Sequence, residues 1–297
     1  MRFFDQNLKD KTNLLSPFLD SLVQNKIGVT LTPSVSSKNK MIITGQLIDD
    51  TTNDSLAFVN VGIPNKNTGT VADIHGHFRI EIDSILKADS LIFSLVGYQN
   101  QSIAVADLTG KSPGIKILMA KKFYPLKEVV IVSPSKITKV IGNTTTSRFV
   151  GIGLPLKFLG SETGIKLHLG KKPVLLKSFS FNISENRLDS AVFRLNIYSL
   201  MNGTPYENIL HQNIFLSVGK QTGIYTLDLK SYQLILKGEV LLSLEWVQGF
   251  AGKPGNRAIF LSAGFLNSAT WHRLTSQAQW KKATGLGVGF NVLVQKL

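Results

Sequence analysis

Residues 68–82 read TGTVADIHGHFRIEI, and this stretch contains the turn and strand from which the fold of the first half can be worked out. Residues 78–82 alternate between apolar and polar side chains, which predicts a strand with one buried face. Asp73 can accept hydrogen bonds from backbone N–H groups two or three residues further on. Gly76 can supply the positive φ of a tight turn. We therefore predict a structural turn formed by Asp73, Gly76 and Phe78.

Two histidines in this stretch raise the alternative of a metal site. His75 and His77 are two residues apart and follow Asp73. A metal site needs a third and a fourth ligand, and no spacing in the sequence points to them. The turn is the preferred interpretation, and we expect no metal and no cofactor.

Short strands extend outward from the turn in both directions. Antiparallel sandwiches are typically built from β-rich segments of this length, separated by Gly, Asn and Asp. We predict seven strands, at residues 41–49, 58–63, 78–82, 91–97, 102–106, 115–120 and 128–132.

The order of these motifs resembles the carboxypeptidase-regulatory-like domain of the Bacteroidetes cell envelope, over residues 41–132. The match departs from the family pattern at residues 56–58, Leu-Ala-Phe, where the family usually has a proline before the strand. The matching residues are Gly45, Asp49, Asn60, Val61, Gly69, Thr70, Asp73, Gly76, Phe78, Leu91, Phe93, Ser94, Gly97, Tyr98, Leu126, Glu128, Val129 and Val130.

The resemblance implies a seven-stranded, transthyretin-like β-sandwich without catalytic activity of its own. It also implies a location in the cell envelope, in the periplasm or at the outer membrane. Residues 1–40 predict a helical lead-in and linker, with no signal peptide. Either the start of an exported protein is misplaced or truncated here, or the protein is not exported. No apolar run approaches the ~20 residues of a transmembrane helix.

The second half predicts another all-β domain. Residues 133–147 are interpreted as a polar linker, and residues 148–297 as a jelly-roll-like β-sandwich. Its eight expected strands are at residues 162–169, 174–183, 191–200, 213–218, 223–229, 239–247, 258–265 and 287–294.

The net positive charge of the chain is concentrated in this second half. Residues 1–132 carry 14 Lys and Arg against 12 Asp and Glu, whereas residues 133–297 carry 19 against 7. Such a basic domain favours weak contact with anionic polymers or lipids. The lysines are dispersed, so we expect no specific nucleic-acid binding.

Catalytic motifs are missing from the sequence. The chain has no cysteine, and none of its five histidines is followed by Glu within three residues, as zinc peptidases require. No catalytic residue is therefore predicted, although folding could still bring two carboxylates together. The stretch at 267–285 contains Trp271 and Trp280, which could stack on sugar rings or could cap the edge of the sandwich.

Three functional interpretations follow. The preferred one is a non-enzymatic binding or assembly module of the cell envelope. The alternatives are a carbohydrate-binding protein that uses the second sandwich and, with less support, a hydrolase with a dispersed site. Expected partners are envelope proteins or polysaccharide.

Overall fold

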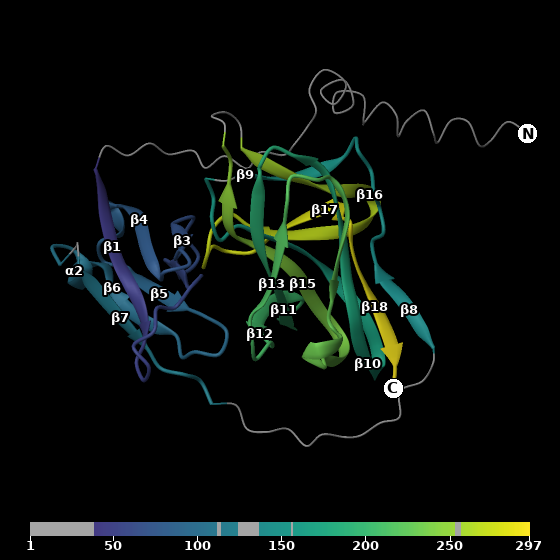
Figure 1. The fold of residues 1–297 in the computed structure, drawn as a ribbon, viewed down its shortest axis with the longest axis horizontal. Coiled ribbons are helices and arrows are strands. Elements are labelled where there is room, and N and C mark those ends of the chain that lie inside the picture. Colours follow the sequence, from purple (N-terminus) through teal and green to yellow (C-terminus); the bar gives the residue numbers. More distant parts are fainter. Residues whose placement is uncertain (1–38, 112–113, 124–136, 156, 253–256) are drawn as a thin grey trace, which may run out of the picture.

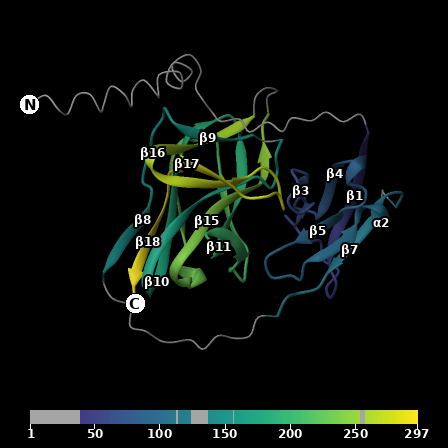
Figure 2. The same ribbon diagram turned by 180° about the vertical axis from the view of Figure 1, so that it is seen from behind.

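The fold consists of two groups of β-sheets (Figure 1). A computed structural model of the chain describes residues 39–111, 114–123, 137–155, 157–252 and 257–297. Strands β1–β7 form one group and β8–β18 the other, and no strand of one group pairs with a strand of the other among the described residues. We refer to these groups as the first and the second domain. The view from behind shows them side by side (Figure 2). The predicted all-β fold is confirmed.

The first domain is a sandwich of two sheets. One sheet has the order β4-β1-β7 and the other β3-β2-β5-β6. Two short helices, η1 and α2, connect strands. The elements are β1 (Lys40–Asp49), β2 (Asn60–Gly62), β3 (Gly69–Val71), β4 (His77–Asp83), η1 (Ser84–Leu86), β5 (Ser90–Ser94), β6 (Gln101–Ala104), α2 (Val105–Leu108) and β7 (Ile115–Met119).

The core of the first domain follows from the alternation in its sequence. Phe78, Ile80 and Ile82 of β4 are buried, and the intervening Arg79 and Glu81 are exposed. The Phe78 ring meets Phe93 of the opposite sheet edge to face, with 5.5 Å between ring centroids. Six of the seven predicted strands are present, and β3 was missed. The predicted strand at 128–132 and the helical lead-in up to residue 38 lie outside the described residues.

The turn before β4 is held by one carboxylate. Asp73 Oδ1 accepts hydrogen bonds from the backbone N–H groups of His75, at 2.9 Å, and His77, at 2.8 Å. Gly76 has a φ of 75°, and a Cβ there would lie 2.6 Å from the carbonyl oxygen of Leu47. Both histidines are exposed. The described part of the chain contains no group of three or more His, Asp or Glu side chains placed to hold a metal ion.

The second domain is also a β-sandwich, built as a single hydrogen-bonded network of eleven described strands. One short helix, η2, lies between β14 and β15. The elements are β8 (Thr138–Gly142), β9 (Gly151–Pro155), β10 (Glu162–Asn186), β11 (Ser190–Met201), β12 (Thr204–Asn208), β13 (Ile214–Val218), β14 (Gly223–Asp228), η2 (Lys230–Tyr232), β15 (Ile235–Phe250), β16 (Ala258–Arg273), β17 (Lys281–Val288) and β18 (Phe290–Lys296).

The long strand β10 connects the layers of this sandwich. Its first part pairs with β15 and β16, its middle part pairs mainly with β14 and β18, and its last residues pair with β16 again. The register against β15 shifts on both sides of Gly170, which has a φ of 91°. The apolar face of β10 contributes to one continuous core, in which the rings of Phe179, Phe181 and Phe290 pack together.

Several sequence-based boundaries in the second half are wrong. The predicted linker at 133–147 includes β8, which pairs with β18. All but one residue of β8 is exposed, so it lacks the apolar face that would have revealed it. Strands β9, β12 and most of β17 were also missed, and the segments predicted at 162–169 and 174–183 are parts of β10. No helix in the described ranges is long and apolar enough to cross a membrane.

Two motif residues of the first domain, Asp49 and Tyr98, are joined directly. The Tyr98 hydroxyl donates to Asp49 Oδ2 at 2.9 Å, and the backbone N–H groups of Thr51 and Thr52 donate to Asp49 Oδ1. The N–H groups of Thr52 and then Thr51 lower the pKa of Asp49 from 3.8 to about 2. Burial and the bond to Asp49 raise the pKa of Tyr98 to about 12.

Because the pKa of Asp49 is lower in the folded chain, its ionised carboxylate should stabilise the fold above pH 3.8, with that contribution lost as the pH falls toward about 2. We expect the difference in free energy of unfolding between the wild type and Asp49→Asn to shrink over that interval. Urea denaturation at a series of pH values measures it. A difference in free energy of unfolding that does not vary with pH would contradict the lowered pKa of Asp49.

Replacing Gly76 with Ala should destabilise the protein by about 1–3 kcal/mol, because the φ is positive and the added Cβ meets Leu47. His75→Asn in the same turn should change stability by no more than about 0.5 kcal/mol, since the side chain is exposed. Thermal denaturation of both variants compares them. Equal losses of stability in the two variants would contradict the structural role given to Gly76 in the turn.

A candidate functional site between the two domains

Four neighbouring strands of the second domain each place one charged residue on the face opposite the core. These are Arg194 on β11, Glu245 on β15, Glu162 on β10 and Arg273 on β16. Arg194 lies opposite Glu245, Glu245 opposite Glu162, and Glu162 opposite Arg273. The register therefore aligns them across the sheet, and we call these four residues the charged row.

The charged row is buried and internally compensated. Arg194 Nε and Nη2 donate to Glu245 Oε2 at 3.0 and 2.8 Å, and Arg273 Nε donates to Glu162 Oε2 at 2.8 Å. Both glutamate side chains are fully buried, and those of Arg194 and Arg273 are 2% and 10% exposed. Two carboxylates directly opposite each other repel, so each depends on its own arginine.

Neutral side chains extend the network around the two carboxylates. Asn196 Nδ2 donates to Glu162 Oε1 and to Glu245 Oε2, both at 2.9 Å. Ser243 donates to Glu162 Oε1 as well. Burial raises the pKa of Tyr198 well above its usual range, so its hydroxyl stays protonated and donates to Glu162 Oε2 at 3.1 Å. Glu162 therefore accepts hydrogen bonds at both of its oxygens.

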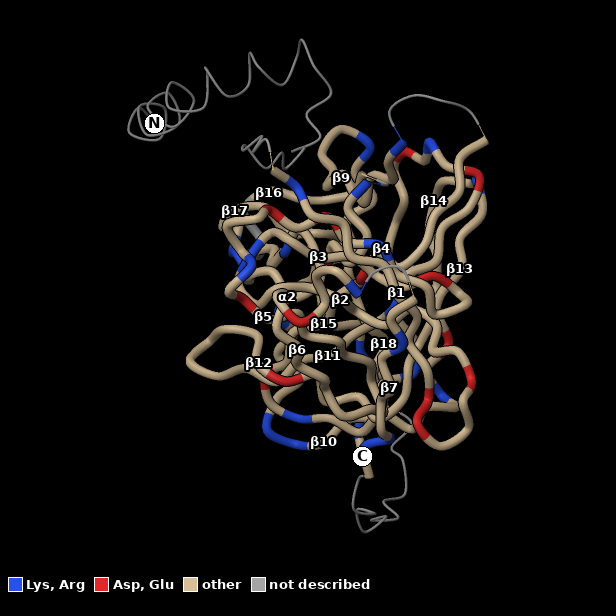
Figure 3. The backbone as a smooth tube through the Cα atoms, turned by 90° about the vertical axis from the view of Figure 1, so that its left-hand side faces the viewer, with Lys and Arg blue, Asp and Glu red and all other residues tan. Residues whose placement is uncertain are grey.

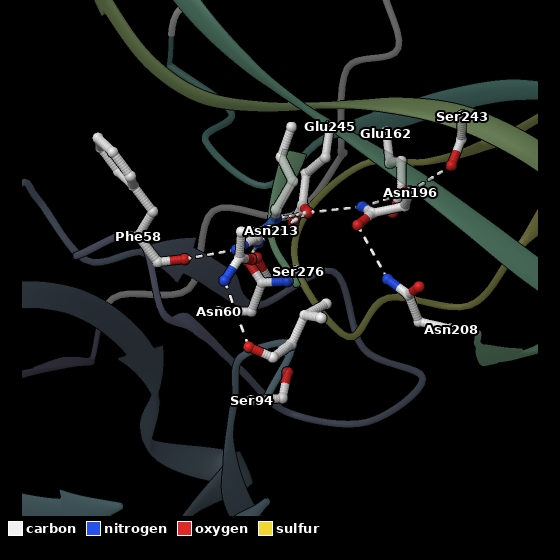
Figure 4. Close-up of polar contacts among 12 residues, drawn as sticks. Phe58, Asn60, Ser94, Glu162, Asn196, Asn208, Asn213, Ser243, Glu245 and Ser276 are labelled. Atoms are coloured by element: carbon white, nitrogen blue, oxygen red, sulfur yellow. Dashed lines mark hydrogen bonds and ion pairs between the residues drawn. The ribbon is translucent and has the colours of Figure 1, made fainter. Parts of the chain in front are cut away.

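The network continues into the first domain through Arg194. Its Nη1 donates to the carbonyl oxygen of Phe58 at 2.9 Å, and its Nη2 donates to Asn60 Oδ1 at 2.7 Å. Ser276 of the second domain donates to the same Asn60 oxygen. Figure 4 shows Phe58 and Asn60 approaching the Glu245 side of the network. The buried guanidinium of Arg194 thus donates hydrogen bonds to residues of both domains.

Apolar contacts flank this polar junction. Phe58 packs with Val71 of the first domain and Val247 of the second, and its ring centroid is 5.3 Å from that of Phe215. Phe58 has a φ of 58°, which proline cannot adopt. It lies in the Leu-Ala-Phe stretch where the sequence departs from the family pattern, so this departure coincides with the contact between the domains.

A cleft of about 320 Å³ lies beside the junction and is lined by both domains. Arg194 and Arg273 contribute to its lining, whereas the two glutamates of the charged row do not. The aliphatic side chains in the lining are those of Leu95, Val96 and Leu210. The polar lining includes Asn60, Tyr98, Asn100, Asn196, Tyr206, Asn208 and Gln277. The cleft is therefore mainly polar.

The two tryptophans proposed for sugar stacking lie beside the charged row. Trp271 is 9% exposed and packs in a small cluster with Tyr198 and Leu241. Trp280 is half-buried, meets the Tyr198 ring edge to face, and has the Arg273 guanidinium 4.9 Å from its ring centroid. The structure thus brings both tryptophans together as a cover for the network, and neither presents a fully open ring face.

The sequence contained a signal for the charged row that the sequence interpretation did not use. In ETGIKLHL, the face opposite Ile165 and Leu167 begins with Glu162, and in EVLLSLEWV the corresponding face includes Glu245. Polar residues on one face of a strand usually indicate solvent. Here the first domain and the loop around Ser276 cover that face.

The fold and the site define a class of protein with two β-sandwiches that share a polar cleft. Residues 43–131 match the family model of the CarboxypepD_reg-like domain, which confirms the resemblance seen in the sequence. No curated protein matches the chain.

Among solved structures, the chain is similar to the cysteine protease and lectin-like domains of Cwp84, a surface layer associated protein of Clostridium difficile. The identity is 11% and the TM-score 0.40, over 85% of this chain and 55% of that one. The clostridial cysteine protease Cwp84 after propeptide cleavage gives 12% identity and a TM-score of 0.41, over 91% of this chain and 75% of that one. The chain thus spans about half the length of the first of these structures, and TM-scores this low carry no functional argument.

Arg194→Met should destabilise the protein by about 3–5 kcal/mol, because it leaves the Glu245 carboxylate buried without its cation. It should also separate the unfolding of the two domains into two calorimetric transitions, since the bonds to Phe58 and Asn60 are lost. The matched control is Arg79→Met, whose exposed pair with Glu81 should be worth no more than about 1 kcal/mol. Equal effects of the two substitutions would contradict the role given to Arg194.

Proposed function

We propose that this protein is a non-enzymatic binding or assembly module of the bacterial cell envelope, whose two domains act as one rigid unit. The observation that carries this proposal is the polar cleft, to which both domains contribute side chains above a buried, charge-neutral network. Binding sites work best when their polar groups are held in place before the ligand arrives. The location in the envelope is supported by the family of the first domain.

The geometry of the carboxylates supports binding over hydrolysis. Glu162 and Glu245 do come together, since both accept a hydrogen bond from Asn196. A glycosidase needs such a pair to reach its substrate, one carboxyl group as acid and the other as base or nucleophile. Here both carboxylates are fully buried, are bound by arginine and lie outside the cleft lining. Their arrangement suits a structural role.

Carbohydrate binding through Trp271 and Trp280 has less support than binding in the cleft. A stacking platform needs an open ring face, whereas Trp271 is only 9% exposed. Both rings pack beside the charged row and help to bury it.

The excess positive charge of residues 133–297 supports weak, salt-sensitive contact with anionic envelope polymers. Figure 3 shows Lys and Arg on many separate elements, interspersed with Asp and Glu. Such a dispersed distribution favours nonspecific electrostatic attraction of anionic polymers. Specific recognition of a ligand would come from the cleft.

The function is tested by combining a binding assay with a product assay. The full chain is run in affinity electrophoresis against peptidoglycan, lipopolysaccharide and capsular polysaccharide, and the same mixtures are assayed for new reducing ends. We expect retardation by at least one polymer and no release of reducing ends. Release that is abolished in a folded Glu162→Gln variant, but kept in Glu239→Gln, would show catalysis and overturn the proposal. Glu239 is the matched control because its carboxylate is exposed.

A further inference from the structure

The cleft contains hydrogen-bonding groups that the protein itself does not use. Asn60 is 8% exposed, and its Nδ2 has no hydrogen-bond partner among the described residues, because only its Oδ1 is engaged. Arg273 uses Nε and Nη2 but makes no hydrogen bond through Nη1 within the described ranges. Gln277 donates through Nε2 to Ser94, which leaves its Oε1 as an acceptor. Donors and an acceptor thus line one cleft.

An exposed aromatic ring and an exposed amide lie among the same lining residues. Tyr206 on β12 is 55% exposed, and Asn100 is also exposed. Neither side chain has a hydrogen bond or ion pair with another described residue. Tyrosine rings of this kind can pack against the C–H face of a sugar, with the hydroxyl left to bind. The amide can both donate and accept.

The charges around the cleft sum to zero. Arg194 and Arg273 are matched by Glu245 and Glu162, and the remaining charged side chains of the lining are Lys122 and Glu207. A site without excess charge gives no advantage to an anionic or a cationic ligand. The few aliphatic side chains offer no apolar pocket for the anchor residues of a peptide.

We propose that the interdomain cleft binds a short segment of a neutral oligosaccharide. Sugar hydroxyls both donate and accept, which matches the free groups of Asn60, Arg273, Gln277 and Asn100. Tyr206 provides the ring for stacking. A volume of about 320 Å³ is at the small end of ligand sites, so a short segment fits. This inference rests on the proposed binding function and gives it a ligand class.

The test is isothermal titration of the full chain with hexaoses of neutral sugars: cellohexaose, xylohexaose, mannohexaose, maltohexaose and chitohexaose. Hexagalacturonate and a heparin hexasaccharide are the acidic comparisons. We expect at least one neutral hexaose to bind with an affinity that is unchanged between low and high salt. Tyr206→Ala and Asn100→Ala should each weaken that binding about tenfold. Tyr206→Phe should weaken it less, because the ring remains.

The control is Phe265→Ala, which removes an exposed ring on β16 outside the cleft and should leave affinity within about twofold. Circular dichroism and melting curves establish that each variant is folded. The inference is overturned if no neutral hexaose binds, if only acidic ones bind and salt abolishes it, or if folded Tyr206→Ala and Asn100→Ala variants bind normally. If none of the neutral hexaoses binds but the chain still binds an envelope polymer without cleaving it, the neutral-oligosaccharide inference is wrong and the proposed binding function stands. Release of reducing ends would instead refute the proposed function.

Discussion

The buried row of Arg194, Glu245, Glu162 and Arg273 is the constraint on which the rest of the second domain and its contact with the first depend. Two carboxylates opposite each other in a sheet are unfavourable, and removing four charges from water is costly. Both costs are offset because the order across the strands is positive, negative, negative, positive. Asn196 and Tyr198 donate to the two oxygens of Glu162, whereas Glu245 Oε1 has no hydrogen-bond partner among the described residues. The four strands cannot slip in register without breaking this alignment.

The same row explains how the two domains are held. Arg194 has five N–H donors, and Glu245 takes only part of them, so the others bind the backbone of Phe58 and the side chain of Asn60. Close packing supports this, since a Cβ at Gly69 would lie 2.3 Å from the carbonyl oxygen of Ser276. Phe58 adds apolar contact from the stretch that departs from the family pattern. The segment that matches the CarboxypepD_reg-like model therefore contributes both the core of the first domain and the contact with the second.

Rigidity at the junction has a functional consequence. A cleft between two domains opens and closes when the domains move, unless their interface is large or specifically bonded. Here Arg194 is part of both the junction and the cleft lining, so its hydrogen bonds to Phe58 and Asn60 link the groups on either side of the cleft. Under the binding function proposed above, affinity would not have to offset the cost of ordering the site. Both carboxylates of the charged row are bound by arginine and hold this geometry.

The sequence by itself determined the all-β fold, six strands of the first domain and the turn at Asp73 and Gly76, because strand alternation and turn chemistry are local. It did not reveal β8, whose residues are mostly exposed, or the joining of two predicted strands into β10. The charged row could be suspected only as polar residues on single strands. Its formation requires Glu162, Arg194, Glu245 and Arg273 to meet in one register, and pairing between distant strands is decided by tertiary packing. The same packing placed Trp271 against the network and made a cleft from two domains.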